Sequence, residues 1–138
     1  MVMDKTFVII KPDAVGKAVI GEILSFFERN DLRIIELRML NMERPDAEEL
    51  YSVHRDKPFY SDLVEFITSG PIVACILEGE GAIERVREII GATDPKKAKS
   101  GTIRAKFGTD IQVNAVHASD SEESYRREAP IIFGDRIF

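Results

Sequence analysis

The chain has 138 residues, of which 44% are hydrophobic and 31% are charged, so we expect residues 1–138 to form a single globular domain. Its formal net charge of −5 argues against general nucleic-acid binding, because such binding needs a basic face. The sequence has no signal-peptide pattern and no apolar run of membrane-spanning length, and its single cysteine excludes an internal disulfide, so we expect a cytoplasmic protein with no membrane partner.

The first half of the chain predicts two strands and three helices. A continuous apolar run predicts a buried strand over 6–10, which Pro12 ends. Apolar side chains recur at helical spacing over 16–29, which predicts a helix. Apolar and charged residues then alternate over 35–39, which predicts a second strand. Two shorter helices are expected over 45–51 and 59–68.

The second half predicts two more strands, with a long loop before the last one. An apolar run over 72–77 predicts the third strand, and the helix expected over 82–90 ends at Gly91. Residues 93–111 show little periodicity, and a loop of this length in a small domain is usually functional. The fourth strand is expected over 112–117 and the last helix over 121–129.

Without its short extra helices, this order of elements is βαββαβ. It predicts an α+β, ferredoxin-like fold: a four-stranded antiparallel sheet with helices on its faces and a long loop before the last strand. Enzymes, RNA binders and regulatory modules all use this architecture, so the fold alone does not indicate a function.

The clearest functional signal is His117, which the predicted fourth strand delivers at its end. Histidine ionises near neutral pH and offers a ring nitrogen as nucleophile or proton carrier. Ser119 and Glu122 have the S-x-x-E spacing of a capping box, so we expect a helix to begin close behind the histidine, where backbone N–H groups favour an anion. A lone histidine is more often a packed or surface residue, so the phosphate site that this predicts needs support from other residues.

Two common kinds of site are excluded by the sequence. No G-x-x-x-x-G-K-[ST] motif occurs, and in the G-x-G run at Gly79 the third glycine is replaced by Glu84. The clustered His, Cys and carboxylate residues of a structural metal site are also missing.

Six segments in order along the chain resemble nucleoside diphosphate kinases, and the similarity extends from Thr6 to about Phe133. They are residues 10–13 (IKPD), 56–59 (DKPF), 69–71 (SGP), 91–95 (GATDP), 100–104 (SGTIR) and 114–121 (NAVHASDS). Six motifs in register are very specific, so residues 1–138 are identified as one domain of this family.

The resemblance implies a ping-pong kinase with broad base specificity. The γ-phosphate of a nucleoside triphosphate would move to His117, on Nδ1 according to the family, and then to the β-phosphate of a nucleoside diphosphate. Such a transfer needs an in-line nucleophile and dispersed positive charge more than covalent chemistry.

The resemblance also assigns contacts to the phosphates. Lys11, Arg87 and Arg104 would bind the phosphate oxygens or the leaving oxygen, and Thr93 and Tyr51 would add hydroxyl donors. Arginine suits this role because its planar fork binds phosphate oxygens in pairs. The ordinary alternative for each cation is a solvated surface charge, and Arg87 is the most open to it because its helix has a charged face.

By the same resemblance, Phe59 stacks on the base, and Asn114 binds the ribose. Phe59 without the family would be an ordinary core aromatic. Ser119 and Glu128 would support His117, although their separation along the chain does not show that they meet. Asn114 and His117 would point to opposite faces of a regular strand, so we expect Asn114 at the end of the long loop, before the strand begins.

The family also implies partners and a cofactor. Mg²⁺ is expected on the phosphates of the bound nucleoside di- or triphosphate, with no protein ligand of its own. A homo-oligomer is expected, with a hexamer favoured and a tetramer as the alternative. His54 matches no functional position and is expected in an exposed loop. The competing interpretations are a catalytically inactive nucleotide-binding regulatory module and an RNA-binding sheet, and the acidic charge disfavours the second.

Overall fold

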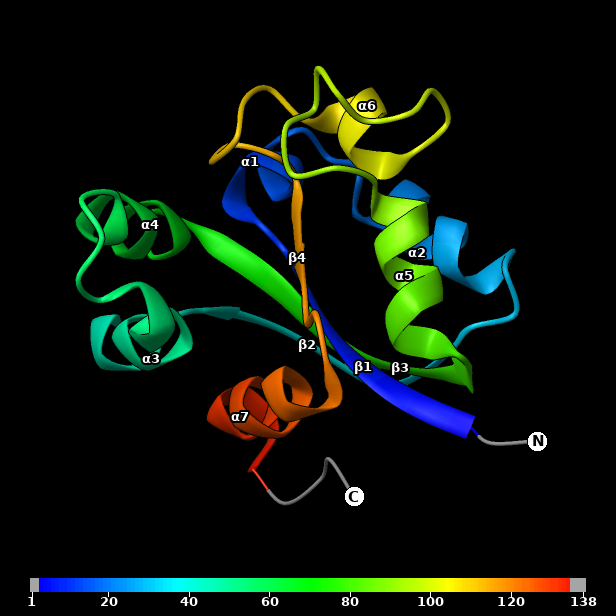
Figure 1. Ribbon diagram of the computed structural model, residues 1–138, viewed down its shortest axis with the longest axis horizontal. Coiled ribbons are helices and arrows are strands. Elements are labelled where there is room, and N and C mark those ends of the chain that lie inside the picture. Colours follow the sequence, from blue (N-terminus) through cyan, green and yellow to red (C-terminus); the bar gives the residue numbers. More distant parts are fainter. Residues whose placement is uncertain (1–2, 135–138) are drawn as a thin grey trace.

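The computed structural model describes residues 3–134 as one layered α+β unit (Figure 1). Its strands are β1 (Met3–Ile10), β2 (Arg33–Asn41), β3 (Pro71–Glu80) and β4 (Val116–Ala118). Its helices are α1 (Pro12–Gly16), α2 (Ile20–Glu28), α3 (Arg44–Leu50), the short 3₁₀ turn η1 (Ser52–His54), α4 (Tyr60–Ile67), α5 (Ala82–Ile90), α6 (Ile103–Phe107) and α7 (Glu122–Phe133). Within residues 3–134, no helix is long and apolar enough to cross a membrane.

The four strands form one antiparallel sheet in the order β2-β3-β1-β4. The helices α2 and α5 each connect two parallel strands that have an antiparallel strand between them. This topology confirms the predicted ferredoxin-like fold.

Hydrophobic side chains of β1 project from both faces of the sheet, because neighbouring residues of a strand point in opposite directions. Phe7 and Ile9 pack with α3, α4 and α7, whereas Val8 and Ile10 pack with α1, α2, α5 and α6. In Figure 1, α2 and α5 lie on one side of the sheet and α3, α4 and α7 on the other. A strand buried on both faces reads as a continuous apolar run, which is why the sequence located it correctly.

The helix predicted over 16–29 is wrong at its start. Pro12 does more than end β1: it begins α1, where a missing N–H is tolerated in the first turn. The chain then breaks at Ala18, which has a φ of 60°, before α2 begins at Ile20. An L-residue in this left-handed conformation cannot continue a right-handed helix.

The C-terminal third also differs from the prediction. The fourth strand is shorter than 112–117, because only residues 116–118 pair with β1. The long loop contains the helix α6, capped by Thr102. Ser121 rather than Ser119 caps α7. That helix also runs past 129 through Pro130, and its last residues Ile132 and Phe133 are buried against the sheet.

Candidate active site

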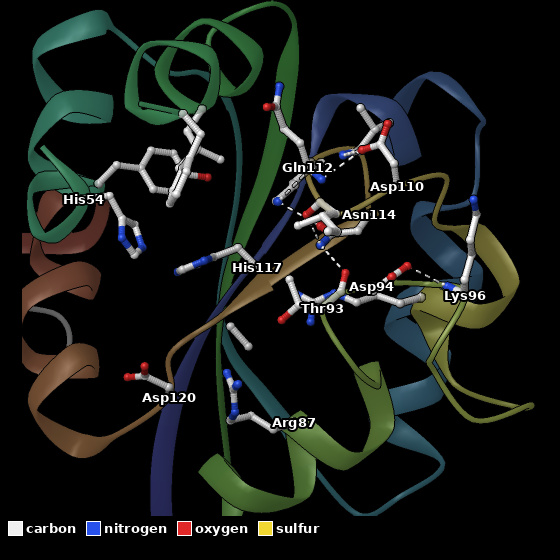
Figure 2. A pocket seen from close by; sticks show the side chains of 18 residues that line it. His54, Arg87, Thr93, Asp94, Lys96, Asp110, Gln112, Asn114, His117 and Asp120 are labelled. Carbon is white, nitrogen blue, oxygen red and sulfur yellow. Dashed lines mark hydrogen bonds between the residues drawn. The ribbon is translucent and has the colours of Figure 1, made fainter. Parts of the chain in front are cut away.

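A pocket of about 880 Å³ opens at the end of β4, between η1 and α4 on one side and the loop before β4 on the other. In Figure 2, His117 lies between His54 on one side and Thr93 and Asn114 on the other. The pocket brings together predicted residues from distant parts of the chain: Lys11, Tyr51, Phe59, Arg87, Thr93, Arg104, Asn114 and His117.

His117 projects into this pocket from β4, where it pairs with Ile9 of β1. Its Nε2 lies 2.9 Å from Oε1 of Glu128. An ionised carboxylate only accepts hydrogen bonds, so Nε2 carries the ring proton and donates a hydrogen bond to Glu128, which leaves the lone pair on Nδ1. The rings of Phe7 and Tyr51 contact the imidazole edge-on, with centroids 6.4 and 6.3 Å away. The contact with Glu128, which lies outside the pocket lining, thus decides which ring nitrogen is unprotonated.

The carboxylate of Glu128 accepts hydrogen bonds from two other side chains besides His117. Ser119 Oγ donates to the same Oε1 at 2.9 Å, and Arg127 donates to Oε2 at 3.2 Å. Burial raises the pKa of the Glu128 carboxyl, but its hydrogen bonds with His117 and Ser119 and the charge of Arg127 hold that pKa below its usual value. Glu128 is therefore ionised at neutral pH. The side chains of Ser119 and Glu128, which the resemblance paired, do meet.

Lys11 follows β1 directly and is nearly buried, with its Nζ donating to Asn114 Oδ1 at 2.9 Å. Burial and the charge of Arg104 lower the pKa of Lys11 to about 8. The carboxylates of Asp13 and Asp110 oppose this lowering. Lys11 is therefore still mostly charged at pH 7, although the two carboxylates do not fully offset the effects of burial and Arg104 on its pKa.

The sequence placed Arg104 in an irregular loop, and this prediction is wrong, because Arg104 lies on the short helix α6. Its guanidinium donates to the backbone carbonyls of Gly91 at 3.1 Å and Val116 at 2.9 Å, which fix its orientation. Burial and the nearby charge of Arg87 lower the pKa of Arg104 to about 10, so it stays protonated at neutral pH.

The three cations Lys11, Arg87 and Arg104 line the pocket, and within residues 3–134 none of them forms an ion pair with a carboxylate. The same part of the chain holds no group of three His, Cys, Asp or Glu residues suited to a metal ion. Charged groups in a site of reduced polarity interact strongly with an opposite charge. The lining therefore suits a polyanion such as a chain of phosphates.

Asn114 lies at the end of the loop, before β4 begins, as expected from its spacing to His117. It is 1% exposed, and its amide nitrogen donates to the backbone carbonyls of Thr93 at 3.0 Å and Ile111 at 2.8 Å. Together with the bond from Lys11, these contacts tie the two ends of the long loop to the cationic site.

Two exposed apolar side chains, Phe59 and Ile111, also line the pocket. Phe59 is 42% exposed and precedes α4, so it is not a core aromatic. Ile111, 64% exposed, also lines the pocket. The expectation that His54 lies in an exposed loop is wrong: the side chain is half-buried, lines the pocket, and its ring centroid lies 5.4 Å from that of Phe59. Burial and the Glu128 charge raise the pKa of the Tyr51 hydroxyl, which therefore remains a donor.

Sequence reasoning missed Asp13 and Asp110, two acidic residues near the cations, as well as Ile111 and His54. Asp110 has a signal that could have been read, because Asp favours turns in which its side chain accepts backbone N–H groups two and three residues on. Its Oδ1 accepts from Gln112 N at 2.9 Å and Val113 N at 2.7 Å. Asp13 has no such local signal, since its contact is with a residue far along the chain.

Comparison with known proteins agrees with this geometry. The family model described as nucleoside diphosphate kinase matches residues 4–137. The chain is 55% identical to the nucleoside diphosphate kinase of Hyperthermus butylicus over 98% of this chain and 95% of that one, and 52% identical to that of Coxiella burnetii over the full length of both.

Solved structures are equally similar. The crystal structure of the Aquifex aeolicus nucleoside diphosphate kinase superposes with a TM-score of 0.93 at 49% identity, covering 96% of each chain. A nucleoside diphosphate kinase from Halobacterium salinarum, solved in complex with CDP, superposes with a TM-score of 0.92 at 40% identity, covering 96% of this chain and 88% of that one.

Proposed function

Because the chain belongs to the nucleoside diphosphate kinase family and transfers phosphate between nucleotides, we propose that His117 is the group that carries the phosphate. The observation that supports this most directly is the hydrogen bond between His117 Nε2 and Glu128, which leaves Nδ1 as a nucleophile in a pocket that Lys11, Arg87 and Arg104 also line. The reaction is then a ping-pong exchange, with two half-reactions at one site.

In the first half-reaction, the lone pair of His117 Nδ1 attacks the γ-phosphorus of a nucleoside triphosphate. The bond from that phosphorus to the bridging oxygen breaks, and its electron pair leaves with the nucleoside diphosphate. Nε2 keeps its proton, so no proton has to move, and the positive charge that spreads over the ring faces Glu128. A terminal β-phosphate oxygen of a second nucleoside diphosphate then attacks the phosphohistidine and regenerates the free ring.

The phosphate chain binds among Lys11, Arg87 and Arg104, while the hydroxyls of Tyr51 and Thr93 add donors. A loose, metaphosphate-like transition state spreads charge over its oxygens, so fixed positive groups stabilise it. Mg²⁺ would enter with the nucleotide and would supply further positive charge to its phosphates. Lys11, Arg87 and Arg104 would hold the phosphates themselves, and Mg²⁺ usually needs few protein ligands.

The nucleoside occupies the part of the pocket lined by Phe59 and Ile111. Phe59 stacks on the base, and the exposed side chain of Ile111 provides an apolar surface nearby. Asn114 Oδ1, which already accepts from Lys11, has a second lone pair for a ribose hydroxyl. Stacking tolerates every base, so the enzyme accepts purine and pyrimidine nucleotides alike.

The test of this function is a labelling and chase experiment. Wild-type protein with Mg²⁺ and γ-labelled ATP should take up one acid-labile label per chain, and unlabelled GDP or CDP should then remove it as GTP or CTP. Labelling of the protein without release to a diphosphate would contradict the ping-pong scheme. Nucleotide binding without any label would instead favour an inactive regulatory module.

Replacing Phe59 with alanine should weaken binding of every nucleotide by a similar factor. Loss of stacking costs about 1–3 kcal/mol, which predicts a KM raised roughly tenfold with little change in kcat, because stacking is equal in the ground and transition states. Steady-state kinetics with ATP, GTP and CTP would measure this. Val53→Ala, at a position 54% exposed beside the pocket, is the control and should behave as wild type. A loss confined to one base would contradict the stacking role.

Replacing Glu128 with glutamine keeps an acceptor near His117 but removes the charge that faces the ring. We expect kcat to fall on the order of 100-fold while KM changes little, because the effect grows as positive charge develops on the imidazole. Rapid-quench measurement of phosphohistidine formation would show it. Glu122→Gln, in an exposed ion pair on the same helix, is the matched control. An unchanged rate of phosphorylation would exclude an electrostatic role for Glu128.

The remaining proposals concern the state of the protein in the cell. Residues 1–138 form a single kinase domain, and the chain acts as a homo-oligomer, with a hexamer favoured and a tetramer as the alternative. The apolar side chains of Leu37 and Met39 support association, because they are 54% and 58% exposed on the edge strand β2. The free, buried thiol of Cys75 is compatible with the reducing cytoplasm, where we place the enzyme.

A further inference from the structure

Asn114 and His117 line the same pocket although a regular strand would direct them to opposite faces. The backbone at Ala115 accounts for this. Ala115 has a φ of 75°, and Val116 N–H donates back to the Asn114 carbonyl at 2.9 Å. A hydrogen bond between residues two apart around a positive φ defines a γ-turn of the rare, strained kind. Ala115 is therefore the point at which the loop turns into β4.

Such a turn persists only when surrounding contacts hold it, because an L-residue avoids this conformation. Both backbone groups of Ala115 are held by the segment that follows β1. Its carbonyl accepts from the N–H of Lys11 at 2.8 Å, and its N–H donates to Oδ2 of Asp13 at 3.1 Å. The first contact is main chain to main chain, so Asp13 is the side chain on which the turn depends.

We propose that Asp13 is a positioning residue of the phosphate transfer: its carboxylate holds the γ-turn at Ala115, which lets Asn114 and His117 face one nucleotide. This inference rests on the proposed roles of His117 and Asn114. It concerns a residue on α1, outside the pocket lining, which acts through the backbone rather than on the substrate.

Asp13 has a second, electrostatic consequence for the same site. Lys11 faces Arg104 from α6, Asp110 from the loop before β4 and Asp13 from α1. Burial and Arg104 lower the pKa of Lys11, and Asp13 is one of the two carboxylates that oppose them. The other oxygen of Asp13, Oδ1, is buried and has no hydrogen-bond partner among residues 3–134. Asparagine in place of Asp13 would keep an acceptor for the turn but would not support the positive charge of Lys11.

The chain offers a matched control for Asp13. Pro12 is the first residue of α1 and Pro45 is the second residue of α3, so Asp13 and Asp46 each follow a proline in the first turn of a short helix. Asp46→Ala removes the same favourable charge from a helix start, but the N–H of Ala115 donates to Asp13 and not to Asp46. It should leave phosphorylation of the enzyme within about twofold of wild type.

The experiment measures the rate of phosphohistidine formation at saturating ATP, once wild-type protein has been shown to take the label. Asp13→Ala should slow this step about 10- to 100-fold, since small displacements of a nucleophile have effects of this size. Glycine adopts a positive φ readily, so Asp13→Ala combined with Ala115→Gly should recover at least about fivefold over Asp13→Ala alone. Asp13→Asn should keep most of the rate at pH 7. As the pH rises, it should lose activity at a lower pH than wild type does, because Asp13 no longer raises the pKa of Lys11.

The outcomes separate the inference from the function on which it rests. If wild-type protein takes no label, the proposed function fails before any variant is compared. If wild type is labelled and a folded Asp13→Ala variant reacts at the same rate, Asp13 is not a positioning residue. If the double variant is as slow as Asp13→Ala although its thermal unfolding is normal, the turn at Ala115 is not the means by which Asp13 acts.

Discussion

Replacing His117 with alanine is expected to abolish labelling of the protein by γ-labelled ATP and to reduce nucleotide turnover by at least about 10⁴-fold, because the variant lacks the covalent route itself. The residues that bind the phosphates would remain, held by contacts that do not involve the imidazole. Lys11 is bonded to Asn114, and Arg104 to the carbonyls of Gly91 and Val116. Affinity for ATP should therefore stay near that of wild type while turnover disappears.

His54 supplies the internal control, because the chain has only two histidines and both line the pocket. His54→Ala should still take up acid-labile label at its active site, whatever its affinity for nucleotide. Mapping the phosphorylated residue by mass spectrometry under neutral conditions would decide between the two rings. Label retained by His117→Ala would assign the nucleophile to another residue and overturn the mechanism proposed above.

Activity should fall as the pH rises through about 8, because that is the pKa to which burial and Arg104 lower Lys11. Below this pKa the free enzyme holds Lys11 as a cation that attracts phosphate oxygens, and above it the amine is neutral. The alkaline limb of kcat/KM should therefore lie near pH 8. Bound phosphates favour the charged form, so the corresponding limb of kcat should lie at higher pH.

Replacing Lys11 with methionine should remove this limb and lower kcat/KM by about 10²- to 10³-fold at neutral pH, the usual effect of removing one fixed stabilising group. Lys97→Gln, at an exposed position in the loop before α6, is the control for loss of one positive charge. It should change kcat/KM only slightly, and less at high salt. A methionine variant that keeps the alkaline limb would show that a group other than Lys11 titrates there.

Much of the fold was readable from local sequence. The apolar run 6–10 lies within β1, which is buried on both faces, and the helix expected over 82–90 matches α5. Both signals are local, because a strand buried on both faces is apolar throughout and a glycine commonly ends a helix. The family resemblance named eight of the 18 residues that line the pocket for a different reason: family motifs preserve the outcome of tertiary contacts that no periodicity reveals.

What the sequence by itself determined, then, is the order of the main elements, the family and the chemical types gathered for phosphate transfer. Only the tertiary structure decided three hydrogen bonds: His117 Nε2 donates to Glu128, Lys11 donates to Asn114, and the backbone N–H of Ala115 donates to Asp13. Lys11 and Asn114 are 103 residues apart in the chain, and Asp13 and Ala115 are 102 apart. Contacts of this kind depend on how all the elements pack, whereas propensity and turn chemistry act over only a few residues.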